Sequence, residues 1–297
     1  MKRLMLAAAF AAAGCAATGE PRGTRPTYLQ SITATVPNQD ALRDHIFVPG
    51  LDDGYVPQGL TAGGSHLFVS SYKPTPDLKA NTGPCRVYRI EIATGKPAGH
   101  FDIAPGVCTH AGGLAWMGNG RLMIADTRQV FRVDVERALA TGKADGAMQG
   151  VKITGLLRGS WGTFDGKDAW IGTWTKEQPK ALMFRLPARL WDEFDGQTVM
   201  EDRAIESMPV PLEAQGGAFD RQGNLWVSAS GPKFGKLYRL DRKGNIQAQY
   251  DMVAGLEDLA IDDAGNLWGL SESGTRKYAH WDTQYPYIFR IDVARLK

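Results

Sequence analysis

Several features that would point to common functions are scarce or absent in this 297-residue sequence. It contains only three cysteines and five histidines, and no CxxC pair. No HExxH helix, phosphate-binding loop, Gly-x-Ser-x-Gly turn or EF-hand loop occurs, so the sequence gives no support to those mechanisms. The net charge is only +2, without a basic run interleaved with aromatics, which makes nucleic acid an unexpected partner.

A long hydrophobic run is also missing, and the one apolar stretch near the N-terminus is too short to span a bilayer. Lys2 and Arg3 precede this stretch, as in an export signal. Its end, Ala12-Ala13-Gly14-Cys15, resembles the lipobox of bacterial lipoproteins, which implies a lipid on Cys15 and an outer-membrane location. Ordinary signal cleavage near Ala13 or Ala17 is the alternative.

These features divide the chain into three parts. Residues 1–15 are interpreted as the signal peptide, 16–27 as a flexible tether rich in Gly, Thr and Pro, and 28–297 as one domain. Under this interpretation the membrane is contacted only through the N-terminal lipid. The partner would be a small-molecule ligand or an envelope protein.

The remaining cysteines, Cys85 and Cys108, would then fold in an oxidising compartment. There a pair of cysteines more often forms a disulfide than a redox or metal site. We therefore predict a Cys85–Cys108 disulfide, and two buried free thiols are the alternative.

The mature chain contains five copies of one pattern. A small, apolar segment is followed by a turn and a strand, and then by a second strand with an arginine in constant register. The first strands read SHLFVSSY at 65, GRLMIADT at 120, DAWIGTWT at 168, GNLWVSAS at 223 and GNLWGLSE at 265. The arginines are Arg89, Arg132, Arg185, Arg239 and Arg290.

A fourth strand fits between the copies, for example at Ala98–Ile103, so a four-stranded unit recurs roughly every 50 residues, the size of a propeller blade. The fifth copy ends near the C-terminus without its outer strand. Strand-like residues at Tyr28–Val36 and His45–Val48 could supply it and join the chain ends. The prediction is an all-β propeller of five blades closed by the N-terminal strand, with six blades as the alternative.

The blade strings, above all QGGAFDRQGNLWVSAS at 215–230, resemble those of the senescence marker protein, gluconolactonase and NHL-repeat propellers. The gluconolactonase branch implies a divalent cation at the channel mouth, held by acidic and amide side chains before the inner strands. In this sequence Glu257, which Asp258 follows, is the only acidic residue at the matching positions. A calcium or zinc ion held by Glu257 and Gln58 is the expected form of such a site.

In a propeller the loops before the innermost strands and those after the second strands share one rim. His110 and Glu257 are accordingly the candidate catalytic residues, His110 as an acid, a base or a metal ligand. Each also has a structural alternative. His110 could be a hydrogen-bonded loop histidine, and Glu257 could be a carboxylate that accepts backbone N–H groups. The candidate ligand-binding residues on this rim are Gln58, Gln215, Trp161, Trp174, Asp126 and Glu272.

Two hypotheses for function follow. One is an envelope hydrolase of the gluconolactonase type acting on a lactone or ester in the channel mouth. The other is a non-catalytic propeller that binds a ligand or a protein through its loops. The scarcity of carboxylates favours binding, and the convergence of His, Gln and Glu favours chemistry.

Overall fold

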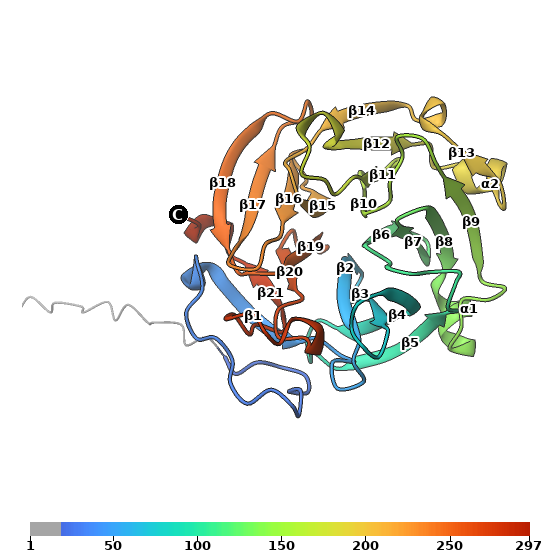
Figure 1. Ribbon diagram of the computed structural model, residues 1–297. Helices are drawn as coiled ribbons and strands as arrows, with labels where there is room; N and C mark the ends of the chain where they lie inside the picture. Colours follow the sequence, from blue (N-terminus) through green and yellow to red (C-terminus); the bar gives the residue numbers. More distant parts are fainter. Residues whose placement is uncertain (1–18) are drawn as a thin grey trace, which may run out of the picture.

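The computed structural model describes residues 19–297, which form five β-sheets arranged radially around a central channel (Figure 1). The five-bladed propeller expected from the repeats is confirmed. The lipobox with Cys15 and the signal peptide lie outside the described residues. Within the described part the longest helix has seven residues, and no helix could span a bilayer.

Each blade is an antiparallel sheet whose first strand lies at the channel. Blade one contains β2 (Val56–Gly63), β3 (His66–Pro74), β4 (Asn81–Glu91) and β5 (Pro97–Ile103). Blade two contains β6 (Gly113–Gly118), β7 (Arg121–Asp126), β8 (Gln129–Asp134) and β9 (Met148–Ile153), to which the short β13 (Thr198–Val199) adds in parallel. Blade three contains β10 (Trp161–Phe164), β11 (Ala169–Gly172), β12 (Leu182–Leu186) and β14 (Glu206–Pro209).

Blade four contains β15 (Ala214–Phe219), β16 (Leu225–Ala229), β17 (Gly235–Leu240) and β18 (Ile246–Met252). Blade five contains β19 (Leu256–Ile261), β20 (Leu267–Ser271), β21 (Tyr287–Ile291) and, from the N-terminus, β1 (Leu42–Phe47). The two short α-helices are α1 (Val135–Thr141) and α2 (Leu190–Phe194), both at the outer edge (Figure 1). Single 3-10 turns occupy Gln39–Ala41, Gln178–Lys180, Glu201–Arg203, Arg276–Tyr278 and Val293–Arg295.

The two ends of the chain meet in blade five, as the sequence predicts. β1 pairs antiparallel with β21, from Leu42 opposite Ile291 to Phe47 opposite Tyr287. Residues 28–36, expected as a strand, are instead turns and loop. The reason is that β1 already pairs with β21, so residues 28–36 have no place at the edge of β21 where the sequence predicted them.

The flexible tether predicted for residues 16–27 is wrong for Arg22 and Thr27, which are hydrogen-bonded to the propeller. The Arg22 N–H donates to the His45 carbonyl (2.9 Å), and the Phe47 N–H donates to the Arg22 carbonyl (2.9 Å). The Thr27 N–H donates to the Asp52 carboxylate at 2.9 Å. These residues are held to the propeller because the outer edge of β1 offers free backbone groups.

The repeated turn has a specific physical basis. In blades three, four and five an aspartate in the turn accepts a hydrogen bond from the indole N–H of the tryptophan on the second strand. The pairs are Trp170 with Asp165 (3.0 Å), Trp226 with Asp220 (3.2 Å) and Trp268 with Asp262 (2.9 Å). Buried indole N–H groups need such a partner, which explains why Asp and Trp recur together.

The third-strand arginines make contacts within the blades. Arg185 pairs with Asp168 (2.8 Å) and Glu206 (3.0 Å), and Arg132 and Arg290 pair with Asp192 and Asp44. The guanidinium of Arg239 lies 5.9 Å from the ring centroid of Trp226. These residues therefore fasten strands and turns rather than line the channel.

A single carboxylate fastens the blades to one another at the centre. The Asp258 side chain is fully buried and accepts the N–H groups of Leu60 (2.9 Å), Leu114 (3.3 Å), Gly217 (3.1 Å) and Leu259 (2.8 Å). These donors belong to the inner strands of blades one, two, four and five. Burial raises the pKa of Asp258, and the four N–H donors oppose that rise.

Candidate functional site

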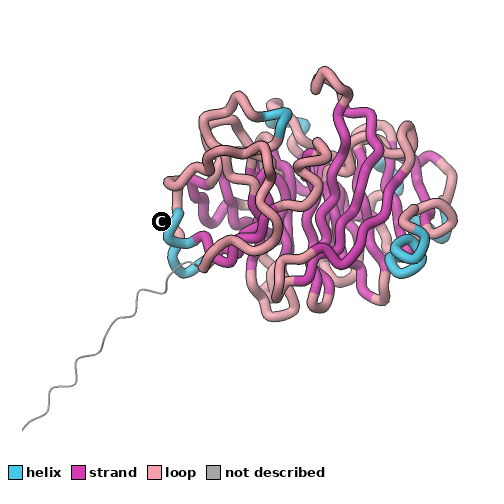
Figure 2. Tube along the Cα trace, turned by 90° about the horizontal axis from the view of Figure 1, so that it is seen from below, coloured by secondary structure: helices cyan, strands magenta, loops and turns pink. Residues whose placement is uncertain are grey.

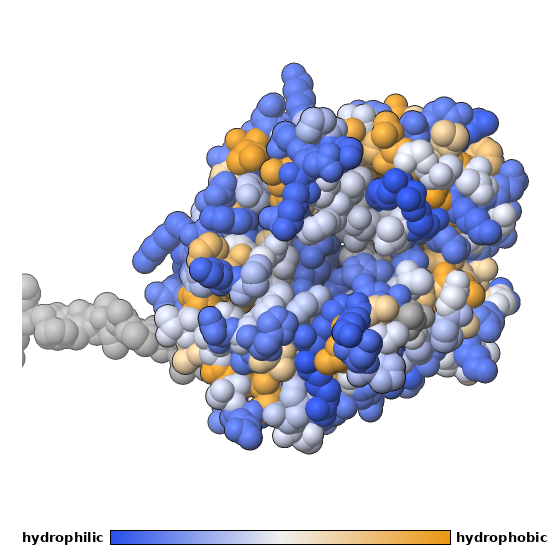
Figure 3. Space-filling view, viewed as in Figure 1, coloured by the Kyte–Doolittle hydropathy of each residue, from blue (hydrophilic) through white to orange (hydrophobic). Residues whose placement is uncertain are grey.

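A cavity with a volume of about 850 Å³ opens on the face that carries the long loops. That face, hollowed near its centre, is shown in Figure 3. A side view shows one pair of strands, β3 and β4, extending beyond the others (Figure 2). The cavity walls come from the loop before β10, the β11–β12 loop, the β16–β17 loop and the loop after β20.

The cavity wall is mixed in character. Apolar surface comes from Leu156, Trp174, Pro179, Pro232 and Trp281. Charged side chains are Arg158, Lys176, Lys180, Glu213 and Glu272. A pocket with apolar walls and a few polar groups is the usual form of a small-molecule site.

Two buried carboxyl groups lie close together here, and one of them, that of Glu272, lines the cavity. Glu257 on β19 and Glu272 just after β20 are 1% and 5% exposed. Gln58 on β2 donates to Glu272 (3.0 Å), and Gln215 on β15 donates to Glu257 (3.1 Å). The channel geometry thus joins Gln58 and Glu272, which are 214 residues apart in the chain.

Both carboxyls have raised pKa values. Burial, followed by the negative charge of Glu272, raises the pKa of Glu257 well above its usual range. Burial also raises the pKa of Glu272 to about 7, although hydrogen bonds from neighbouring side chains and the charge of Lys277 oppose the rise. Paired carboxyls with separated pKa values are a common acid–base device in enzymes.

The expected cation site at Glu257 and Gln58 has an unsuitable set of donors. Gln58 uses its amide NH₂ on both the Pro57 carbonyl (2.7 Å) and Glu272, so its nitrogen faces these acceptors. Gln215 likewise turns its NH₂ to Glu257. No group of three His, Cys, Asp or Glu side chains within residues 19–297 is arranged to hold a metal. A hard cation needs six or more oxygens, and these residues do not fit one.

Beside the carboxyl pair lies a polar network that the sequence did not reveal. Lys277 donates to the Tyr72 hydroxyl (2.7 Å) and to Oδ1 of Asn81 (2.9 Å). Burial lowers the pKa of Lys277, while the charge of Glu272 opposes this effect. Tyr278 lies next to Glu272, and burial followed by the Glu272 charge raises its pKa. The only hint in the sequence was the length of the loop from Ser271 to Pro286.

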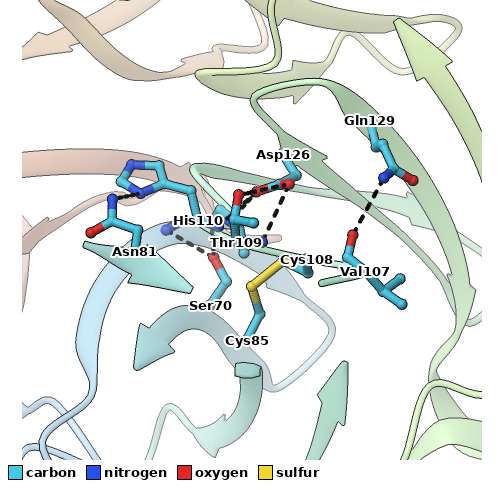
Figure 4. Close-up of a disulfide and its surroundings, with 11 residues drawn as sticks. Ser70, Asn81, Cys85, Val107, Cys108, Thr109, His110, Asp126 and Gln129 are labelled. Carbon is cyan, nitrogen blue, oxygen red and sulfur yellow. Dashed lines mark hydrogen bonds between the residues drawn. A yellow bond between two sulfur atoms is a disulfide. The ribbon is translucent and has the colours of Figure 1, made fainter. Parts of the chain in front are cut away.

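The same network fixes the proton on His110. Because Lys277 can only donate, Oδ1 of Asn81 faces it, and Nδ2 of Asn81 donates to Nδ1 of His110 at 2.9 Å (Figure 4). The neutral ring therefore carries its proton on Nε2. Burial lowers the pKa of His110 to about 4, with Asp126 opposing and Lys277 reinforcing the shift. The arrangement favours an N–H donor at the cavity wall over the general base considered from the sequence.

Asp126 supports His110 instead of facing a ligand. Its carboxylate accepts the backbone N–H groups of His110 (2.7 Å) and Ala111 (2.9 Å), next to the Cys85–Cys108 disulfide (Figure 4). The predicted disulfide is confirmed. It ties β4 to the loop that carries His110, so it stiffens one wall of the site.

The two candidate tryptophans have different surroundings. Trp174 lines the cavity and is 42% exposed, so its ring is available to a ligand. Trp161 is completely buried among core side chains of blades three and four, which leaves no face free for stacking. Its position on the innermost strand, packed between neighbouring sheets, explains the difference.

Of the sequence-derived candidates, the structure brings His110, Gln215, Trp174 and Glu272 to one cavity. Gln58 and Glu257 do not line the cavity but are hydrogen-bonded to the lining residues Glu272 and Gln215, respectively, and Asp126 and Trp161 lie outside it. The residues that sequence reasoning missed are Asn81, Arg158, Lys277 and Tyr278. Each sits in a loop or at a strand end whose path the repeats do not determine.

No family model matches the chain, and no curated protein matches its sequence. Solved structures that are similar to this chain include a protein assigned to the gluconolactonases, with 15% identity, a TM-score of 0.44, and coverage of 91% of this chain and 86% of the other. Another is a calcium-binding protein, regucalcin, from Agrobacterium tumefaciens, with 15% identity, a TM-score of 0.42, and coverage of 82% and 93%.

A third is the hydrazine synthase of Kuenenia stuttgartiensis, with 13% identity and a TM-score of 0.41. The match covers 83% of this chain but only 58% of the synthase chain. The first two belong to the propeller group that the blade strings resemble. With TM-scores below 0.5, these similarities carry no argument about the fold, substrate or metal of this chain.

Proposed function

We propose that this propeller binds a small organic molecule in the channel-mouth cavity and hydrolyses an ester or lactone bond in it without a metal. The observation that carries the proposal is the buried Glu257–Glu272 pair, whose pKa values are raised by burial and of which Glu272 lines a ligand-sized cavity. A carboxyl with a pKa near the working pH is suited to general acid–base catalysis. Non-catalytic binding in the same cavity is the competing function.

In this mechanism the Glu272 carboxylate accepts a proton from a water molecule as the water oxygen attacks the carbonyl carbon. The N–H at Nε2 of His110 donates to the developing oxyanion. When the tetrahedral intermediate collapses, the C–O bond to the alcohol breaks, and Glu272 returns the proton to the leaving oxygen. Ester and water thus become acid and alcohol, with Glu257 and Gln58 holding Glu272 in position.

A screen of aryl esters and lactones with the purified mature chain tests this function. We expect hydrolysis that is unaffected by a chelator and whose kcat/KM rises with pH through about 7, as Glu272 ionises. Metal analysis of the same sample should find no stoichiometric ion. Activity that disappears with chelator would contradict the metal-free mechanism, and saturable ligand binding without turnover would establish the non-catalytic function.

We also propose that the protein is exported and anchored by a lipid on Cys15. The Cys85–Cys108 disulfide supports an oxidising compartment, because such bonds rarely persist in the cytosol. Wild-type protein should fractionate with membranes and release a lipid-modified N-terminal peptide. The Cys15→Ser variant should lose both properties, and membrane association that persists in the variant would contradict the anchor.

A further inference from the structure

Arg158 stands out among the charged residues of the cavity because its charge is not neutralised. Lys176 pairs with Glu213 (3.4 Å), and Lys180 pairs with Glu177 (2.8 Å). Within residues 19–297, no carboxylate forms an ion pair with Arg158, and its half-buried guanidinium also feels the charge of Arg128. Burial, followed by this repulsion, lowers the pKa of Arg158.

One edge of this guanidinium is fixed and the other is free. Nη1 donates to the carbonyls of Gly155 (2.7 Å) and Leu157 (2.7 Å), which holds the group in its loop. In the described part of the chain, Nε and Nη2 donate to no protein group. This is the edge that binds a carboxylate side-on, as Arg86 does when its Nε and Nη2 hold Asp102 at 2.6 and 2.9 Å.

Apolar surface lines the same cavity as Arg158. Leu156, two residues before Arg158, is 58% exposed, and Trp174, from the β11–β12 loop, is 42% exposed. Large exposed apolar side chains next to an unneutralised arginine favour a ligand with an apolar body and a negative group.

From this arrangement we propose that the cavity selects an organic anion, a carboxylate or sulfonate, whose negative group binds the Nε–Nη2 edge of Arg158 and whose apolar part packs on Trp174. This assignment rests on the proposed function for the existence of a ligand site and adds the class of molecule that the site takes. A hydrolysable substrate would then be an ester or lactone that also carries an acidic group.

Two fluorescent probes that differ in one negative group test the proposal. These are 1-anilinonaphthalene-8-sulfonate and its uncharged parent, N-phenyl-1-naphthylamine, titrated into wild type and variants at low and high salt. We expect wild type to bind the anionic probe more tightly. Arg158→Gln should weaken the anionic probe about tenfold and leave the neutral probe unchanged, as expected for loss of a charge-assisted contact.

Three further variants sharpen the result. Arg158→Lys should keep part of the preference, because the charge remains but the two-pronged edge is lost. Trp174→Ala should weaken both probes, which locates them in the cavity. Lys243→Gln, which removes an exposed cation from a turn outside the cavity wall, should change neither.

The outcomes separate the two proposals. Unchanged affinity of the anionic probe in Arg158→Gln, or equal weakening of both probes, would overturn the anion assignment while leaving the ligand cavity intact. Binding of both probes that is insensitive to Trp174→Ala, or no binding by wild type, would overturn the cavity as a ligand site. Retained binding of the neutral probe by Arg158→Gln shows that this variant is folded.

Discussion

Asp258→Ala is expected to destabilise the protein more than any other single substitution considered for this chain. The variant leaves four buried N–H groups, from inner strands of four blades, without their shared acceptor. An unsatisfied buried donor costs about 1–3 kcal/mol, so the total loss is on the order of 4 kcal/mol or more. Since domains are stable by only about 5–15 kcal/mol, much of the variant should be unfolded or insoluble.

Urea unfolding followed by tryptophan fluorescence provides the measurement. The matched control is Asp241→Ala, which removes a turn aspartate that accepts the N–H groups of Lys243 and Asn245 at the protein surface. The control should shift the unfolding midpoint far less, because water can replace the lost acceptor. Equal midpoints for the two variants would show that Asp258 does not fasten the blades.

Glu272→Gln is expected to abolish hydrolysis, with a fall in kcat of about 10²–10⁴-fold, the usual contribution of a general base. The isosteric amide keeps the size of the side chain but cannot take a proton from water. Glu213→Gln is the matched control, because Glu213 also lines the cavity yet pairs with Lys176. Comparable losses in the two variants would contradict the role given to Glu272.

The same residue makes stability depend on pH in a defined direction. Burial raises the pKa of Glu272 from 4.5 to about 7, so between these values the folded protein binds more protons than the unfolded chain. Its contribution to the free energy of unfolding must therefore decrease as pH rises through this window, by at most about 1.4 kcal/mol per pH unit. In Glu272→Gln this decrease should be smaller, as measured by urea midpoints at pH 5, 6 and 7.

If Glu272→Gln is inactive and still shows the wild-type pH dependence of stability, the raised pKa belongs elsewhere in the site. If the variant loses the pH dependence and remains active, the carboxyl pair is buried for structural reasons. Both measurements on one variant thus separate the catalytic role from the electrostatic one.

The sequence by itself determined the architecture. The strand arginine recurs once per blade and the Asp–Trp turn recurs in blades three to five, and each depends on contacts within a few residues or with the adjacent strand. The missing outer strand of the fifth copy likewise predicted that the chain ends join. Two cysteines that follow a stretch resembling an export signal were sufficient to predict the disulfide. Such features are local or periodic, so they can be recognised without coordinates.

Only the tertiary structure decided what the individual site residues do. Whether Glu257 or Asp258 faces the cavity, and whether Gln58 binds an ion or Glu272, depends on how five separate inner strands converge at one axis. The proton position on His110 depends on Lys277, which reaches Asn81 from a loop 196 residues away in the chain. Burial raises the pKa values of Glu257 and Glu272. The fold also leaves Nε and Nη2 of Arg158 without a hydrogen-bond acceptor in the described part of the chain. These properties arise from distant groups brought together in space, and no local pattern in the sequence records them.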